Sequence, residues 1–277
     1  VEEVEDKDKE ISLEDAQELN PAYQVGDTIV TNFIPKDFGR IAAQTAKQVI
    51  IHGIRDGERG LLYQEFNSKE SEIISTVVNR VEPNGNAILD IGKSQAMLIK
   101  NEQIPGEVLT PGEHVKIYVV EVRAAQKGPQ VLISRTHPGL VTRLFENEVP
   151  EIFNGIVEIK GISREAGSRT KMAVASTERK VDPVGACVGQ RGGRVDRVVT
   201  ELKGEKIDII KWSADPAEFV ANALNPAHVV SVFVSEKDKA CRVVVPDNQL
   251  SLAIGRGGLN VTLAVKLTGY KIDIKAE

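Results

Sequence analysis

Apolar residues change their spacing along the chain, and each spacing predicts a different secondary structure. In residues 40–66 they recur every three to four positions, which predicts a helix. Gly53, Gly57 and Gly60 interrupt this pattern, so we expect a break or a close contact with another helix there. The preceding residues 26–34 resemble a strand without an obvious partner sheet, which indicates part of a larger domain.

From residue 71 the spacing falls to two, which is typical of half-buried strands. Turn residues such as Asn-Gly and Pro-Gly separate the strands. The five predicted strands occupy residues 72–82, 86–92, 95–100, 113–123 and 129–135. Five strands in so short a segment fit a small closed barrel of the OB-fold type, and a generic five-stranded sheet is the alternative.

The rest of the chain contains an internal repeat. The segment GEKIDIIKW at 204–212 returns as GYKIDIKAE at 269–277, and a Gly-x-x-Gly loop at 189–192 returns at 255–258. In both copies a helix and two strands precede the loop, which lies between two further helices, and a strand follows. The sequence therefore predicts two copies of one α+β domain with the element order α-β-β-α-α-β.

Charge is distributed unevenly between these segments. The net charge is −5, but residues 1–30 alone hold ten Asp/Glu against Lys7 and Lys9. Around the first glycine loop, residues 164–197 hold eight Arg/Lys against four Asp/Glu. A local basic patch matters more for binding a polyanion than the charge of the whole chain. We interpret the acidic start as a solvated or linker-like segment.

Several function classes find little support in the sequence. Cys187 and Cys241 have apolar neighbours and no CxxC spacing, which favours buried, reduced thiols in a cytoplasmic protein over a disulfide or a metal site. We expect no cofactor. No apolar run reaches the ~20 residues that a membrane span needs. The four histidines lie in different segments, at His52, His114, His137 and His228. Since no nucleophile–base pair can be named, we do not expect an enzyme.

The Gly-x-x-Gly loops have a specific chemical use. The helix after each loop presents unpaired N–H groups and the positive end of its dipole. Glycine lets a ribose-phosphate backbone approach these donors closely. Arg191, Arg194 and Arg256 add cations suited to phosphate oxygens, and Val188 and Ile254 supply an apolar floor for bases.

This combination is the KH arrangement, in which a GXXG loop clamps about four nucleotides of a single strand. The candidate RNA-binding residues are Val188, Gly189, Gln190, Arg191, Gly192, Gly193 and Arg194 in the first copy, and Ile254, Gly255, Arg256, Gly257, Gly258 and Asn260 in the second. Asn260 either hydrogen-bonds RNA or caps the last long helix.

Two other interpretations of the loops are weaker. Dinucleotide binding needs a strand that leads directly into the glycines, whereas a helix is predicted there. Asp208 and Asp273 lie where that motif places an acid, but outward positions of a half-buried strand explain them better. Purely structural glycine turns are the remaining alternative.

The order of these modules resembles the NusA family of bacterial transcription factors. The segments that carry the resemblance are AAQTAKQVIIHGIRDGER, DPVGACVGQRGGRV, GEKIDIIKW and AIGRGGLNV. The resemblance implies a multidomain α+β protein with a partial α/β N-terminal domain. In this division, residues 1–68 are the later part of an RNA-polymerase-binding domain, and 69–137 an OB-fold of the ribosomal S-one type. Residues 138–213 and 214–277 are two tandem type II KH domains.

The same resemblance implies a function. The family holds nascent single-stranded RNA and, with RNA polymerase and other elongation or antitermination factors, modulates pausing, termination and antitermination. We expect incomplete polymerase docking, because the first portion of that domain is missing from the sequence, and a monomer by default. The barrel is poor in aromatic residues, and Tyr118 is either a base-stacking residue or part of the core, so the KH pair is expected to dominate RNA contact. An accessory module of an RNA-processing or decay complex is the alternative function, and a scaffold without RNA affinity is a third.

Overall fold

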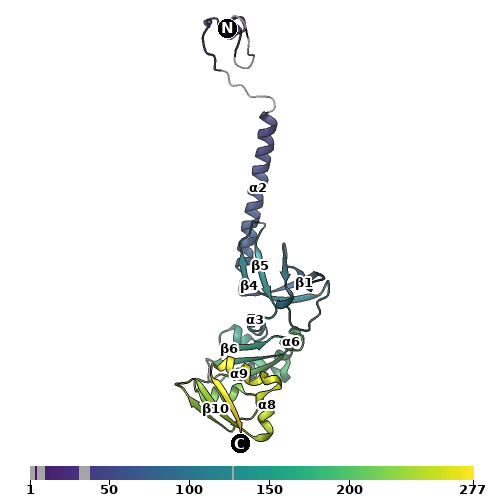
Figure 1. Cartoon of the computed structure of the whole chain (residues 1–277), viewed down its shortest axis with the longest axis vertical. Helices are drawn as coiled ribbons and strands as arrows, with labels where there is room; N and C mark the ends of the chain where they lie inside the picture. Colours follow the sequence, from purple (N-terminus) through teal and green to yellow (C-terminus); the bar gives the residue numbers. More distant parts are fainter. Residues whose placement is uncertain (1–3, 5–9, 31–37, 127) are drawn as a thin grey trace. The chain divides into compact units, whose positions relative to one another are not determined.

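The computed structural model contains two compact units, residues 1–57 and 58–277. It describes residues 4, 10–30, 38–126 and 128–277 (Figure 1). In the first unit, helix α1 (Leu13–Leu19) begins at Ser12, whose hydroxyl accepts a hydrogen bond from the Asp15 backbone N–H at 3.1 Å. The described residues of this unit contain helices and no strand.

Helix α2 (Phe38–Asn67) confirms the predicted helix but not the predicted break. The helix is continuous, and apart from the neighbouring backbone of α2 itself no described atom lies within 4 Å of where a Cβ would stand on Gly53, Gly57 or Gly60. Each glycine costs only about 1 kcal/mol in a helix interior, which a long helix tolerates. The strand predicted at 26–34 is wrong for residues 26–30, which are irregular, and residues 31–34 lie outside the described residues. A strand needs a hydrogen-bonding partner, and the described part of this unit offers none.

The second unit begins with an antiparallel five-stranded sheet, as predicted. Its strands are β1 (Ile73–Val81), β2 (Ala87–Asp90), β3 (Gln95–Leu98), β4 (His114–Arg123) and β5 (Gln130–Ser134). A short 3-10 helix, η1 (Lys100–Glu102), follows β3. In the order β3-β2-β1-β4-β5 the two outer strands approach each other, so the sheet nearly closes into an OB-like barrel. The last turns of α2 pack on the barrel core, where Phe66 is 1% exposed.

The first α+β copy follows the predicted order. It comprises α3 (Pro138–Glu148), α4 (Pro150–Phe153), β6 (Val157–Glu165), β7 (Arg169–Ser176), α5 (Pro183–Val188), η2 (Gln190–Gly192), α6 (Gly193–Glu201) and β8 (Lys206–Lys211). Strand β7 is central, antiparallel to β6 and parallel to β8. This connectivity is the type II KH order that the repeat predicts, and we call the copy KH1.

The second copy, KH2, has the same topology. It comprises α7 (Pro216–Ala223), β9 (Ser231–Ser235), β10 (Ala240–Val245), η3 (Asp247–Gln249), α8 (Leu250–Ile254), η4 (Arg256–Gly258), α9 (Leu259–Thr268) and β11 (Lys271–Ala276). Strand β10 is antiparallel to β9 and parallel to β11. Figure 1 shows α9 of KH2 against β6 of KH1, in agreement with the contacts between these elements.

A buried arginine joins the barrel to KH1. The Arg135 side chain is 0% exposed, and its Nε donates to both carboxylate oxygens of Glu107 at 3.1 and 3.0 Å. Its other nitrogens donate to the Lys116 carbonyl of the barrel at 2.5 Å and to the Glu201 carbonyl of KH1 at 3.1 Å. A buried charge with several partners is costly to disrupt, so this arginine fixes the two modules together.

A buried lysine joins KH1 to KH2. The Lys171 side chain is 0% exposed, and its Nζ donates to Asp208 at 2.9 Å and to the Asn225 carbonyl of KH2 at 2.7 Å. Burial lowers the pKa of Lys171, while the charge of Asp208 acts against this shift. The two KH copies are therefore held in one arrangement instead of being joined only by a tether.

Candidate nucleic-acid interface

The first glycine loop is built around backbone conformations that favour glycine. Helix α5 begins at Asp182, whose carboxylate accepts from the N–H groups of Val184 and Gly185 at 3.2 and 3.0 Å. It ends at Gly189, where φ is 73°, and Gly192 then precedes α6 with φ at 79°. A Cβ on Gly189 would lie 2.7 Å from Cγ of Arg194, so a side chain there would collide with the arginine stem.

The second loop repeats this geometry. Gly255 and Gly258 have φ values of 78° and 75°, close to their counterparts in KH1. A Cβ on Gly255 would lie 2.6 Å from Cβ of Asn260. At the third position, Gly257 has φ at 61° and its counterpart Arg191 has φ at 50°. A left-handed arginine carries backbone strain, and such strain persists mainly where a site requires it.

The helices that follow the loops begin without side-chain caps. The N-cap residues of α6 and α9 are glycines, and among the described residues no side chain accepts a hydrogen bond at these caps. The N–H groups of Gly193 and Leu259, the first residues of these helices, donate to the carbonyls of Gln190 and Arg256. The positive end of each helix dipole still favours an anion there. Gln190, Arg191 and Arg256 are exposed at the loop tips, and neither arginine side chain has a partner among the described residues. Each loop therefore offers an open cation beside the positive end of a helix dipole.

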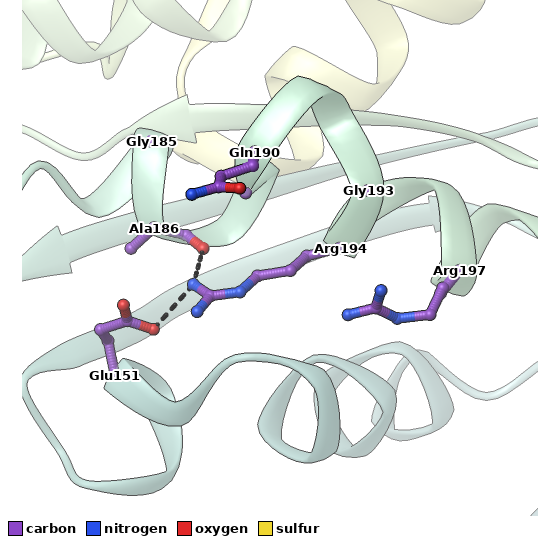
Figure 2. A pocket seen from close by; sticks show the side chains of 8 residues that line it. Glu151, Gly185, Ala186, Gln190, Gly193, Arg194 and Arg197 are labelled. Carbon is purple, nitrogen blue, oxygen red and sulfur yellow. Dashed lines mark hydrogen bonds and ion pairs between the residues drawn. The ribbon is translucent and has the colours of Figure 1, made fainter.

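Arg194 is occupied inside KH1. Its Nη1 donates to the Glu151 carboxylate at 2.9 Å and to the Ala186 carbonyl at 2.6 Å (Figure 2). These residues line a cavity of about 730 Å³ beside the first loop, together with Gln190 and Arg197. Sequence reasoning missed Glu151 and Arg197, since both read as ordinary charges on predicted helices. Arg194 thus supports the loop from below, whereas Arg191 projects from its tip.

Comparison with known families agrees with this architecture. Residues 135–212 match the model of the NusA-like first KH domain, 216–277 that of the NusA-like second KH domain, and 1–60 that of the NusA N-terminal domain. A Bacillus subtilis protein named transcription termination/antitermination protein NusA is 54% identical over 277 residues, covering 100% of this chain and 74% of that protein. The chain belongs to the NusA family.

Other relatives in the NusA family are nearly as similar. The protein of the same name from Thermus thermophilus is 47% identical over 275 residues, which cover 99% of this chain and 71% of that protein. One from Mycobacterium tuberculosis is 48% identical over 251 residues, or 88% of this chain and 72% of that protein. The resemblance that the sequence motifs carry is therefore confirmed.

Asn260 has a position that neither sequence expectation described. It is 1% exposed, and its Nδ2 donates to the carbonyls of Leu224 and Ala253 at 3.1 and 3.0 Å. It does not cap α9, whose N-cap is Gly258, and it has no surface to offer RNA. The side chain instead links the ends of α7 and α8 beneath the second loop. Buried amide N–H groups need acceptors, and these two carbonyls supply them.

The structure also shows the burial of the tyrosine, the cysteines and the apolar loop residues singled out in the sequence. Tyr118 is 8% exposed, and its ring stacks on His137 with centroids 4.7 Å apart, so it belongs to the core between the barrel and KH1. Both cysteines are buried free thiols, as predicted, and burial raises the pKa of Cys187 to about 12. Val188 is half-buried against the KH1 core, whereas Ile254 is 38% exposed.

The described residues show neither a membrane-spanning helix nor a metal-binding cluster. None of their helices is both long and apolar enough to cross a membrane. No group of three or more His, Cys, Asp or Glu among them is arranged to hold a metal ion.

Proposed function

We propose that this member of the NusA family is a transcription factor that binds nascent single-stranded RNA through its two glycine loops. With RNA polymerase, it would act on pausing, termination and antitermination. The observation that carries the proposal is the repetition of one loop geometry, with left-handed glycines, an uncapped helix start and an exposed cation in each copy. The names of the relatives and the KH family models support it.

Each loop would hold the sugar-phosphate backbone and leave the bases to neighbouring surfaces. The phosphates approach the N–H groups at the starts of α6 and α9, where the dipole favours negative charge. Arg191 and Arg256 lie at the loop tips and supply charge-assisted hydrogen bonds. At about four nucleotides per loop, the pair engages about eight. Arg194 and Asn260 act as positioning residues that shape the loops from beneath.

Rigid pairing of the two KH copies would make the loops act together. Lys171 holds KH2 by the Asn225 carbonyl, and Arg135 holds KH1 by the Glu201 carbonyl. When one loop has bound RNA, the second meets it at a high effective concentration, provided that the spacing fits. The fixed joints thus favour strands long enough to reach both loops.

The N-terminal unit bears on the choice of partner. Residues 1–60 match the NusA N-terminal domain, which supports RNA polymerase as the partner instead of a nuclease. We further propose a binding role without catalysis, a cytoplasmic location, and assembly with other elongation or antitermination factors.

Titration with a short labelled single-stranded RNA at several salt concentrations tests the loop assignment. The variants Gln190→Asp/Arg191→Asp and Arg256→Asp/Gly257→Asp each make a loop more negative by three charges. We expect each to weaken binding and to reduce the salt slope, which amounts to about −0.7 per phosphate neutralised. The matched control, Gln44→Asp/Lys47→Asp, makes the same charge change on the exposed surface of α2. Equal affinity for all four proteins would reject the loops as the RNA site.

A further inference from the structure

The outer faces of the KH1 and KH2 sheets carry equivalent rows of residues. In KH1, Lys171 of β7 pairs in register with Ser163 of β6 and Asp208 of β8. In KH2, Arg242 of β10 pairs in the same way with Phe233 of β9 and Asp273 of β11. Each row therefore pairs a basic residue with an aspartate. The third position is a serine in KH1 and a phenylalanine in KH2.

The two rows differ sharply in exposure. Ser163 and Lys171 are 4% and 0% exposed, because KH2 covers this face of KH1. In KH2, Phe233 is 63% exposed, and the side chains of Arg242 and Asp273 are each 62% exposed with 3.8 Å between their charged atoms. A large aromatic residue therefore stands uncovered where the other copy has a small buried one. Core packing gives no reason for a phenylalanine at this position.

The charges and shape around Phe233 suit a nucleic acid. We call this surface the open face, and its outward positions are Ser231, Phe233, Ser235, Ala240, Arg242, Val244, Lys271, Asp273 and Lys275. Three cations stand there against one acid. The small side chains beside Phe233 leave a hollow of about 430 Å³, lined also by Arg242 and Asp273. Aromatic rings on an open sheet with cations beside them are a recurrent means of stacking single-stranded bases.

The open face is continuous with the second glycine loop through one edge strand. Helix α8, which leads into that loop, packs against β11, and β11 is the outer strand of the KH2 sheet. Lys271 and Lys275 project from β11 on the side of the open face. A strand that leaves the second loop along β11 meets these lysines next.

We propose that the open face is a second RNA-binding surface, on which a base stacks on Phe233 while phosphates contact Arg242, Lys271 and Lys275. The open face engages nucleotides beyond those held by the loops. This proposal rests on the proposed function only in requiring that RNA reaches KH2. In KH1 the equivalent surface is closed by KH2, so only the second copy can offer it.

Affinities of the full chain for single-stranded RNAs of about 8 and about 16 nucleotides test this proposal, since about 8 suffice for two loops. Phe233→Ala should weaken binding of the longer RNA about 5-fold or more and leave the shorter one unchanged. Phe233→Trp should restore the loss. Phe153→Ala is the matched control, because Phe153 is 79% exposed in KH1 and lies outside the open face. Unchanged thermal melting of Phe233→Ala confirms folding.

The outcomes separate the open face from the loops. Unchanged affinity of Phe233→Ala for both lengths, or an equal loss for both, overturns the proposal, and the first result leaves a protein as the partner for this face. If the loop variants lose both RNAs while Phe233→Ala loses neither, the loops stand and the open face falls. If Phe233→Ala weakens the longer RNA while the loop variants bind normally, the open face stands and the loop assignment falls.

Discussion

KH1 and KH2 share one fold and one loop geometry, yet their surroundings differ. KH1 has a neighbour on each side, with Arg135 of the barrel on one and the Asn225 carbonyl of KH2 on the other. KH2 packs on KH1 and leaves its outer sheet face open. Both copies keep the left-handed glycines of the loop, whereas the burial of the equivalent sheet rows differs because only the row of KH1 is covered. The charged pair that joins domains in the first copy becomes a surface feature in the second.

The largest expected effect comes from breaking the joint that only KH1 has with the barrel. Arg135→Ala leaves Glu107, whose side chain is also 0% exposed, as an unpaired buried charge. We expect a loss of about 3–5 kcal/mol in the free energy of unfolding of this region, measured by urea denaturation. Arg123→Ala is the control, since its pair with Glu121 is on the surface. A similar urea midpoint for both variants would contradict the role assigned to Arg135.

The equivalent cations of the two copies should respond differently. Lys171→Met leaves Asp208 and the Asn225 carbonyl without their donor, at a cost of about 1–3 kcal/mol. Arg242→Met, at the exposed counterpart, should change stability by less than about 0.5 kcal/mol. Denaturation of both variants measures the difference, and equal losses would mean that burial of the row in KH1 has no energetic consequence.

The titration of Lys171 adds a pH test to this pair. Burial lowers its pKa in the folded protein from the ordinary 10.5, so the folded state releases the proton first as pH rises. Stability contributed by this group therefore increases between the folded pKa and 10.5. The wild type should gain stability relative to Lys171→Met across that alkaline window, and a constant difference would argue against burial of a charged lysine.

Alanine substitutions at the loop glycines should lower stability by smaller amounts, and these amounts should differ between the two loops. Gly189→Ala and Gly255→Ala each force a left-handed alanine, at about 1–2 kcal/mol. The Gly189 methyl meets the stem of Arg194, whereas the Gly255 methyl meets the Asn260 backbone nitrogen at 2.7 Å, so Gly255→Ala should be the more damaging. Gly193→Ala is the control, because φ there is −63° and no described atom lies within 4 Å of the added Cβ. Melting temperatures and RNA affinities should fall most for Gly255→Ala, less for Gly189→Ala and least for Gly193→Ala. A different order would contradict the role given to the loop glycines.

Local patterns in the sequence were sufficient to predict the modules. The glycine loop and the KIDI strand lie within about 20 residues of each other in each copy, so their spacing alone reveals the two domains. The five strands of the barrel follow from alternation and turn residues for the same reason. The break expected in α2 is absent, because a glycine weakens a helix without ending it. The neighbouring residues decide whether the helix continues.

The joints could not be predicted, because their partners are distant in the chain. Arg135 bonds Glu107 and Glu201, and in the sequence all three resemble surface charges. Asn260 resembles a residue at a helix start, and only the fold brings it between the carbonyls of Leu224 and Ala253. Phe233 resembles an ordinary strand residue until its exposure is known.

If one RNA strand engages both loops, the affinity of the chain should depend on the length of the RNA. Single-stranded RNAs of about four and about eight nucleotides are titrated against the wild type and against each single-loop double variant. We expect the wild type to bind the longer RNA more tightly, and either loop variant to bind the longer RNA only as tightly as the shorter one. Equal wild-type affinity for the two lengths, or loop variants that retain the preference, would contradict this expectation.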